Sequence, residues 1–187
     1  MDGERASSPG VGMPLLNYSQ FLHLLKVEFD RAKRYETPLS CLRLEIDRLD
    51  HLADIHGLGA RRFLFDSVVQ LLGVETRSCD FIGRYDDLGI AILLPQTDVR
   101  GAETLARRIQ ERVTNYEFDI QGTPIQISFS IGVASYYRKS SLFHDAVLKA
   151  ADQAARDARR SGGRTIAVDE KSRELTDDRG AESGRES

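Results

Sequence analysis

The chain has 187 residues, of which 41% are hydrophobic and 29% charged, a balance typical of one globular domain with a substantial core. Its formal net charge of −3 gives no reason to expect a nucleic-acid partner, because binding to a phosphate backbone usually needs a basic surface. Two cysteines are too few for a disulfide framework, and no run approaches the roughly 18 apolar residues of a membrane span, so we expect a cytoplasmic protein without a membrane partner.

Both ends of the chain have the composition of disordered segments. Residues 1–14 are polar and rich in Gly and Pro, and residues 169–187 hold seven acids, four bases and no aromatic residue. Such segments bury too little apolar surface to offset the entropy of ordering. We therefore expect an N-terminal arm over residues 1–14, a folded domain over 15–168 and a C-terminal tail over 169–187.

The folded part begins with an amphipathic helix and a strand. Apolar residues recur at helical spacing in SQFLHLLKVEFDRAKRYETP, with Ser19 as the N-cap and Pro38 as the stop. The next segment, LSCLRLEI (Leu39 to Ile46), alternates apolar and polar residues. This alternation predicts a strand with one buried face.

An interrupted helix follows the strand. RLDHLADIHGLGARRFLFDSVVQLLGVETR keeps helical spacing on both sides of Gly57 and Gly59. Next come a hairpin, FIGRYDDLGIAILLP, an amphipathic helix, DVRGAETLARRIQERVTNY, and a β-rich run, IQISFSIGVASY. A last helix over about 142–160 ends at Gly162 and Gly163, before a short strand in RTIAV. This order of elements predicts an α/β fold in which helices pack on a central sheet.

The tip of the expected hairpin carries two adjacent carboxylates, Asp86 and Asp87. Carboxylate oxygens are ligands for hard divalent cations, so these residues offer a candidate metal site. Aspartates are also common in turns, because their side chains accept hydrogen bonds from nearby backbone N–H groups. The residues alone leave both interpretations open.

Three separated segments resemble parts of the GGDEF domain of diguanylate cyclases. RAKRYETPLSCLRLEID resembles the family's first helix and strand, SFSIGVAS its core strand, and AADQAARDARRSGGRT its last helix and turn. The resemblance spans about residues 21–168 and implies the nucleotidyl-cyclase-like fold, a central and mostly antiparallel sheet flanked by helices. It also implies the family's reaction, in which two domains of a homodimer join two GTP molecules into cyclic di-GMP with divalent metal.

One of the two metal-binding acids of the resembled family is lost in this chain, and its hairpin motif is changed. The acid at the end of the first strand falls on Glu45, which keeps the charge. The motif Gly-Gly-(Asp/Glu)-Glu-Phe falls on Asp86, Asp87, Leu88, Gly89 and Ile90. The metal-binding acid is thus Leu88, and aspartates replace the glycines that bring bare backbone to the phosphates, where their charge repels a triphosphate.

Base recognition is changed as well. The family's guanine-reading positions fall on Ala53 and Arg62, which offer no acceptor to the N–H groups of guanine. We therefore expect a catalytically inactive domain that requires no cofactor and no Mg²⁺. A rebuilt metal site of Asp86 and Asp87 with Glu45, and residual cyclase activity, are the less favoured alternatives.

An inhibitory product site of the family has a counterpart in RSCD, Arg77 to Asp80, with five residues between Asp80 and Asp86. An arginine donates to phosphate or to guanine O6 and N7, and a carboxylate accepts from guanine amines. By the same resemblance a second arginine falls on Arg108, or on Arg107 if the register shifts, and Arg159 replaces a family lysine. We expect Arg77, Asp80 and Arg108 to bind cyclic di-GMP and the domain to act on an unidentified protein, a second copy (homodimer) being one candidate. The alternative is a surface ion pair on a nucleotide-independent dimerisation or scaffold domain.

Overall fold

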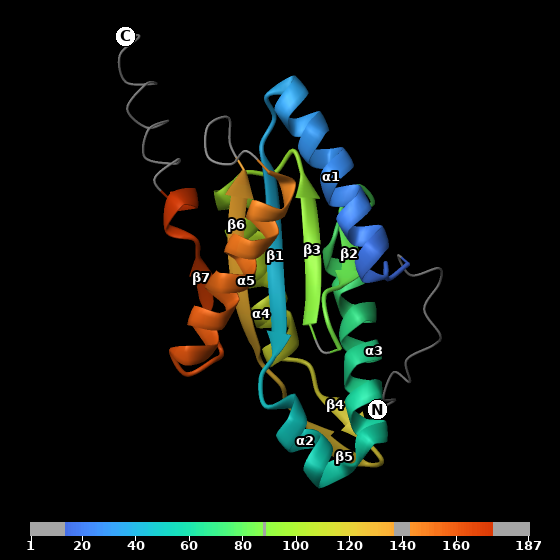
Figure 1. The fold of residues 1–187 in the computed structure, drawn as a ribbon. Helices are drawn as coiled ribbons and strands as arrows, with labels where there is room; N and C mark the ends of the chain where they lie inside the picture. The colour runs from blue at the N-terminus through green and yellow to red at the C-terminus, as the bar shows by residue number, and fades with distance from the viewer. Residues whose placement is uncertain (1–13, 88, 137–142, 174–187) are drawn as a thin grey trace, which may run out of the picture.

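The computed structural model describes residues 14–87, 89–136 and 143–173, and its centre is a five-stranded sheet (Figure 1). In sheet order the strands are β2 (Phe81–Arg84), β3 (Gly89–Pro95), β1 (Leu39–Ile46), β6 (Phe129–Tyr136) and β7 (Ile166–Val168). Neighbouring strands are antiparallel except for β6 and β7. The predicted α/β fold with a mostly antiparallel central sheet is confirmed.

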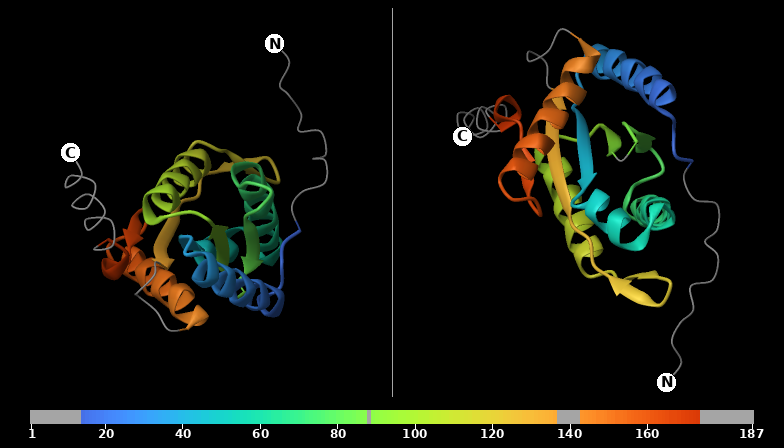
Figure 2. Two further views of the ribbon diagram at one scale, coloured as in Figure 1. Left: turned by 90° about the horizontal axis from the view of Figure 1, so that it is seen from above. Right: turned by 60° about the horizontal axis from the view of Figure 1, so that its bottom comes forward.

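Helices cover both faces of the sheet (Figures 1 and 2). They are α1 (Tyr18–Tyr35), α2 (Leu49–His56), α3 (Leu58–Glu75), α4 (Val99–Thr114) and α5 (His144–Arg160). Helices α1 and α5 pack on one face, while α3 and α4 pack on the other. The prediction that β1 has one exposed face is therefore wrong, since Ser40 and Arg43 are buried beside its apolar residues.

Helix α1 begins two residues earlier than the sequence pattern suggested, with Asn17 as its N-cap. The Asn17 side chain accepts from Gln20 N at 3.0 Å, and the Gln20 side chain accepts from Asn17 N at 2.9 Å. This reciprocal pair satisfies two N–H groups that the helix start leaves open. The prediction of Ser19 as the N-cap is wrong, because Ser19 already lies inside the helix.

Two glycine sites end helices as predicted. Gly57, with φ of +87°, separates α2 from α3, whereas Gly59 lies inside α3. At the end of α5, Gly162 N donates to Arg159 O at 3.1 Å and Gly163 N to Ala158 O at 3.2 Å. Both of these glycines have positive φ, a conformation that glycine adopts without steric cost.

Two parts of the described fold were not predicted from the sequence. A small hairpin of β4 (Phe118–Ile120) and β5 (Thr123–Ile125) lies apart from the main sheet, as the right view of Figure 2 shows. Residues 170–173 form a helical turn whose Ser172 is 2% exposed and accepts from Ser135 N at 2.9 Å. The prediction that the tail begins at residue 169 is therefore wrong for residues 169–173, because these residues pack against β6. The arm at residues 1–13 and the tail at 174–187 lie outside the described residues.

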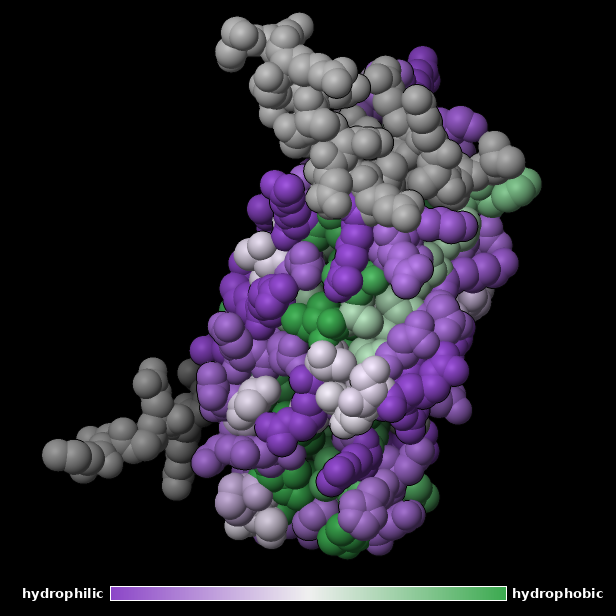
Figure 3. All heavy atoms as spheres, turned by 90° about the vertical axis from the view of Figure 1, so that its left-hand side faces the viewer, coloured by the Kyte–Doolittle hydropathy of each residue, from purple (hydrophilic) through white to green (hydrophobic). Residues whose placement is uncertain are grey.

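The surface on the β7 side is largely hydrophilic, and hydrophobic side chains show there mainly between hydrophilic ones (Figure 3). Among the helices of residues 14–87, 89–136 and 143–173, none combines the length and hydropathy needed to cross a bilayer. Cys41 is buried and Cys79 is exposed, both as free thiols. Burial raises the pKa of Cys41 to about 12, so this thiol stays protonated.

Candidate functional site

The β2–β3 hairpin turn lies next to the end of β1. Gly89 pairs with Glu45 across the two strands, and Tyr85 N donates to Gly89 O at 2.8 Å. Asp86 closes the turn, because its Oδ1 atom accepts from Gly89 N at 2.6 Å. This hydrogen bond is turn chemistry of the kind that the sequence left open for Asp86. Leu88 lies outside the described residues.

A buried arginine lies beneath this turn. Arg43, on β1, is 2% exposed, and its Nη2 donates to Asp86 Oδ2 at 2.8 Å. Its Nε lies 3.3 Å from Asp152 Oδ1 on α5, an ion pair without hydrogen-bond geometry, and its Nη1 donates to Leu44 O at 2.5 Å. The Tyr85 ring lies against the guanidinium, with 4.3 Å between Cζ and the ring centroid. Arg43 therefore joins the hairpin to α5.

Gly89 is required by the position of Arg43. A Cβ atom on residue 89 would lie 2.2 Å from the Arg43 Nη2 atom. The guanidinium ends a long side chain, but it can move only by leaving its two aspartates. Any side chain at residue 89, including the acid of the resembled motif, would therefore collide with Arg43.

Three side chains contact the carboxylate of Asp152, one from α5 itself and two from the sheet and its hairpin. Arg156 forms an ion pair with it one helical turn along α5, where the Arg156 side chain is 53% exposed. On the other side, Arg43 and the Tyr85 hydroxyl approach the same carboxylate. Burial, and secondly the charge of Asp152, raise the pKa of Tyr85 to about 12, so Tyr85 keeps its proton for this carboxylate.

Glu45 is also paired with an arginine. Its Oε1 atom lies 3.1 Å from Arg159 Nη1, and its Oε2 atom is buried without a hydrogen-bond partner among the described residues. In that part of the chain, no group of three or more His, Cys, Asp or Glu side chains is placed to hold a metal ion. The residues near the hairpin do not fit a divalent cation, because guanidinium groups already pair with the carboxylates of Glu45 and Asp86.

The two positions predicted to read guanine in the resembled family are not brought together in one pocket. Arg62 lines a surface hollow of about 350 Å³ that also contains Arg84 and Asp87, and Ala53 is not among its lining residues. The Arg62 side chain is 89% exposed and lies 3.8 Å from Asp66. The acceptors that line this hollow are Asp66 and Asp87, and Arg62 itself offers only donors.

The Arg77–Asp80 turn follows α3. Asp80 is 3% exposed, its Oδ2 accepts from Arg77 N at 2.7 Å, and its own N–H donates to Arg77 O at 3.0 Å. Burial raises the pKa of Asp80, although the Arg77 N–H and the charges of Arg77 and Arg108 lower it. Arg77 itself is exposed, and its guanidinium makes no hydrogen bond or ion pair with the other described residues.

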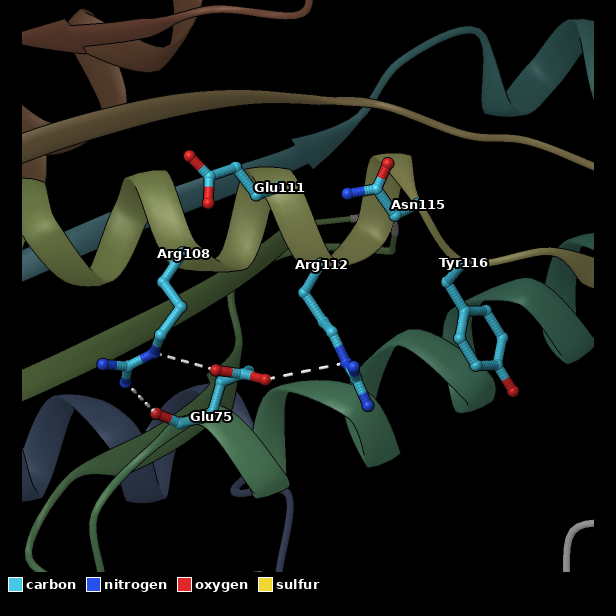
Figure 4. A pocket seen from close by; sticks show the side chains of 6 residues that line it. All are labelled: Glu75, Arg108, Glu111, Arg112, Asn115 and Tyr116. Carbon is cyan, nitrogen blue, oxygen red and sulfur yellow. Dashed lines mark hydrogen bonds and ion pairs between the residues drawn. The ribbon is translucent and has the colours of Figure 1, made fainter.

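Arg108 reaches the same end of α3 from α4 (Figure 4). Its Nε lies 2.8 Å from Glu75 Oε2, and its Nη2 donates to Glu75 O at 2.6 Å. Arg112 approaches the same carboxylate at 3.8 Å, and both arginines line a surface hollow of about 420 Å³. Arg107 instead pairs with Glu103 on its own helix, so Arg108 is the arginine near Asp80.

The sequence interpretation missed Arg43 and Asp152. The available signal was an arginine in the middle of the predicted strand LSCLRLEI, because a buried guanidinium needs an acidic partner. Asp152 lies on the alanine-rich face of α5, where it is 8% exposed. The sequence does not show that these two residues meet, since the helix-to-sheet packing places them together.

Comparison with known proteins identifies the family. Residues 14–165 match the family model described as Diguanylate cyclase, GGDEF domain. Diguanylate cyclase DgcP of Pseudomonas aeruginosa is 27% identical over 156 residues, which is 83% of this chain and 23% of that protein. Diguanylate cyclase DosC of Escherichia coli K12 is 29% identical over 164 residues, which is 85% of this chain and 35% of that protein. The chain thus spans between 23% and 35% of the length of these relatives.

Solved structures show the same fold. The active GGEEF domain of a diguanylate cyclase from Vibrio cholerae has a TM-score of 0.77 at 26% identity, covering 83% of this chain and 98% of that one. The FimX GGDEF domain from Pseudomonas aeruginosa has a TM-score of 0.78 at 26% identity, covering 86% and 99%. The GGDEF domain of DgcB from Caulobacter crescentus, in complex with c-di-GMP, has a TM-score of 0.79 at 20% identity, covering 90% and 99%. This chain belongs to the diguanylate cyclase family through its GGDEF domain.

Proposed function

We propose that this GGDEF domain makes no cyclic di-GMP, binds it at the turn of Arg77, Asp80 and Arg108, and acts on a protein partner. The observation that supports the binding proposal is the exposed guanidinium of Arg77, on a turn where the charges of Arg77 and Arg108 both act on the buried Asp80. A cyclic dinucleotide offers phosphate oxygens and guanine acceptors, which are the groups that arginines bind best. The Caulobacter crescentus DgcB domain was solved in complex with c-di-GMP, a ligand that we extend to this chain.

The proposed loss of cyclase activity is supported by the hairpin. Positions 88 and 89 carry Leu and Gly where the family places acids, and Arg43 pairs with Asp86 at 2.8 Å. Phosphoryl chemistry on GTP needs divalent cations to neutralise developing charge. Because the carboxylates of Asp86 and Glu45 are paired with Arg43 and Arg159, we propose that the domain has no requirement for Mg²⁺.

The three residues of the proposed ligand site have different roles. Asp80 is buried and its carboxylate accepts from Arg77 N, so it holds the turn. Arg77 and Arg108 would supply the donors, Arg108 by partly exchanging its bond with Glu75 for a bond to the ligand. Ligand binding would then weaken the Arg108–Glu75 ion pair, which joins α4 to the end of α3.

Calorimetry with cyclic di-GMP tests the binding proposal. We expect a dissociation constant in the range of about 1 µM, and we expect Arg77→Ala to weaken it at least about tenfold, since one charged hydrogen bond contributes roughly 1.5–3 kcal/mol. Arg107→Ala is the matched control, because Arg107 is exposed and pairs only with Glu103 among the described residues. Absence of heat at high micromolar ligand would refute the receptor function, and binding that survives Arg77→Ala would move the site elsewhere.

A scaffold without nucleotide is the second candidate. Two of the three proposed contact residues are engaged internally, Asp80 with the Arg77 backbone and Arg108 with Glu75. If this function is correct, the domain associates with itself or another protein equally well with and without cyclic di-GMP, which sedimentation velocity measures. Incubation with GTP and Mg²⁺ or Mn²⁺ tests the lost activity, and any cyclic di-GMP formed would contradict our account of the hairpin.

A further inference from the structure

We infer that the proposed cyclic di-GMP site continues along α4, where Arg112 binds the second phosphate of the ligand and the Tyr116 ring stacks on one of its bases. The inference rests on the proposed function, because Arg77 and Arg108 bind the near end of the ligand. A cyclic dinucleotide carries two phosphates and two bases. A site made of Arg77, Asp80 and Arg108 alone would leave half of these groups without a protein contact.

The hollow beside Arg108 runs along the side of α4 that faces α3 (Figure 4). Its volume of about 420 Å³ lies within the range of ligand pockets. Arg108, Arg112 and Tyr116 follow one another at intervals of four residues and extend toward α3, whereas Glu111 and Asn115 extend to the other side of α4 in this view. Since an α-helix rises about 1.5 Å per residue, this row spans roughly 12 Å. It therefore offers contacts at two separate points of one ligand.

Glu75 faces both arginines of this row. Its Oε2 atom lies 2.8 Å from Arg108 Nε, and its Oε1 atom lies 3.8 Å from Arg112 Nε. One carboxylate thus serves two guanidinium groups, and the distance to Arg112 is too long for a hydrogen bond. The Arg112 side chain is also 60% exposed. Its N–H groups are therefore available to a phosphate, whose geometry a guanidinium matches.

Tyr116 places an anchored aromatic ring at the far end of the hollow. The ring packs on the buried Phe118 of β4, with 4.7 Å between centroids and 64° between planes. The backbone is held as well, since Tyr116 N donates to Val113 O at 3.2 Å. Tyr116 nevertheless stays 43% exposed. A ring that is already held in place loses little conformational entropy when a base stacks on it.

Contacts at two points also predict which class of ligand the site selects. A mononucleotide such as cyclic GMP has one base and one phosphate, so it reaches only one end of the row. Stacking accepts any base, so Tyr116 selects for a dinucleotide and not for guanine. The preference for guanine comes instead from the arginines at the near end, whose donors match guanine O6 and N7.

Calorimetry with cyclic di-GMP tests this inference. We expect Tyr116→Ala to weaken binding at least about fivefold, the effect of losing one base–ring stack, and Tyr116→Phe to bind like wild type. Arg112→Ala should weaken binding at least about tenfold, as a charged hydrogen bond is lost. Tyr35→Ala is the matched control, because Tyr35 is 64% exposed on α1 and does not line the hollow. It should leave the affinity unchanged.

The stacking contact has a readout that a purely structural role of Tyr116 would not give. We expect the guanine H8 proton signal of bound cyclic di-GMP to shift upfield in wild type and Tyr116→Phe, and the shift to be smaller in Tyr116→Leu. The leucine keeps an apolar contact with Phe118 without offering a ring, so it also replaces Tyr116→Ala if that variant does not fold.

The outcomes separate this inference from the proposed function. If Arg77→Ala weakens binding while the Tyr116 and Arg112 variants bind like wild type, the extended site is refuted and the receptor function stands. If wild type gives no heat with cyclic di-GMP, both are refuted. Cyclic GMP that binds as tightly as cyclic di-GMP would contradict the contact at two points.

Discussion

The hairpin and the turn after α3 each contain an arginine–aspartate pair, but the two pairs are built in opposite ways. At the hairpin the arginine is buried, with 3% of the Arg43 side chain exposed, and the Asp86 side chain is 51% exposed. At the turn the aspartate is buried and Arg77 is exposed. Burial separates the two arginines, since the Arg43 guanidinium contacts protein oxygens inside the fold, whereas the Arg77 guanidinium is exposed and pairs with no other described residue.

The largest effect is expected from Arg43→Met on stability. Removing one member of a buried ion pair leaves the aspartates uncompensated, which costs roughly 3–5 kcal/mol. Urea denaturation of wild type and variant measures the difference. Arg77→Met is the comparison, with an expected change within about 0.5 kcal/mol because its side chain is exposed. Similar losses for both variants would remove the distinction between the two pairs.

Arg108→Ala is expected to act mainly on binding. Loss of a charged donor should weaken cyclic di-GMP binding by roughly 1.5–3 kcal/mol, which calorimetry measures. The ion pair with Glu75 is partly exposed, so the accompanying loss of stability should be about 0–1 kcal/mol. A variant that loses stability but keeps its affinity would make Arg108 a structural residue like Arg43.

Asp80→Asn is expected to change how stability depends on pH. Burial raises the pKa of Asp80 in the folded state above 3.8, so the folded state binds its proton more tightly than the unfolded state. Stability from this group is therefore present at low pH and is lost as pH rises through the folded-state pKa. The asparagine keeps an acceptor for Arg77 N without the charge, so the variant should lose this decline.

Denaturation of wild type and Asp80→Asn between acidic and neutral pH measures the effect. We expect the variant to gain stability relative to wild type as pH rises above the normal aspartate range. A relative loss over that interval would mean that the ionised carboxylate stabilises the turn, which would make it similar to Asp86.

The smallest effect is expected from Arg156→Met. This arginine contacts Asp152, as Arg43 does, but its side chain is 53% exposed. Solvent screening limits such pairs to about 0–1 kcal/mol, which thermal or urea unfolding can measure. A loss as large as that of Arg43→Met would show that burial is not what separates the two arginines.

The sequence predicted the elements that depend on local patterns. Helical spacing located the helices, and Gly57, Gly162 and Gly163 gave correct ends because only local backbone geometry decides them. The start of α1 was missed, since Asn17 and Ser19 are both good caps and the choice depends on the Gln20 side chain. The β4–β5 hairpin was missed because its strands are only three residues long.

The candidate site was less predictable because its contacts are long-range. RSCD was located by spacing, but the burial of Asp80 depends on packing that the sequence does not show. The pairing of Arg43 with Asp152 joins residues far apart in the chain, and the collision at Gly89 is a feature of three-dimensional packing. Local rules reveal which groups are present, and the fold determines which of them meet.

The segment before α1 determines which edges of the sheet are open to other chains. β2 is the outer strand, and Leu16 lies along it in parallel, donating to Ile82 O at 2.9 Å and accepting from Arg84 N at 2.8 Å. An uncovered outer strand would offer these groups to a neighbouring molecule and invite sheet extension or aggregation. With Leu16 on that edge, a second copy of the domain cannot extend the sheet by adding a strand at β2.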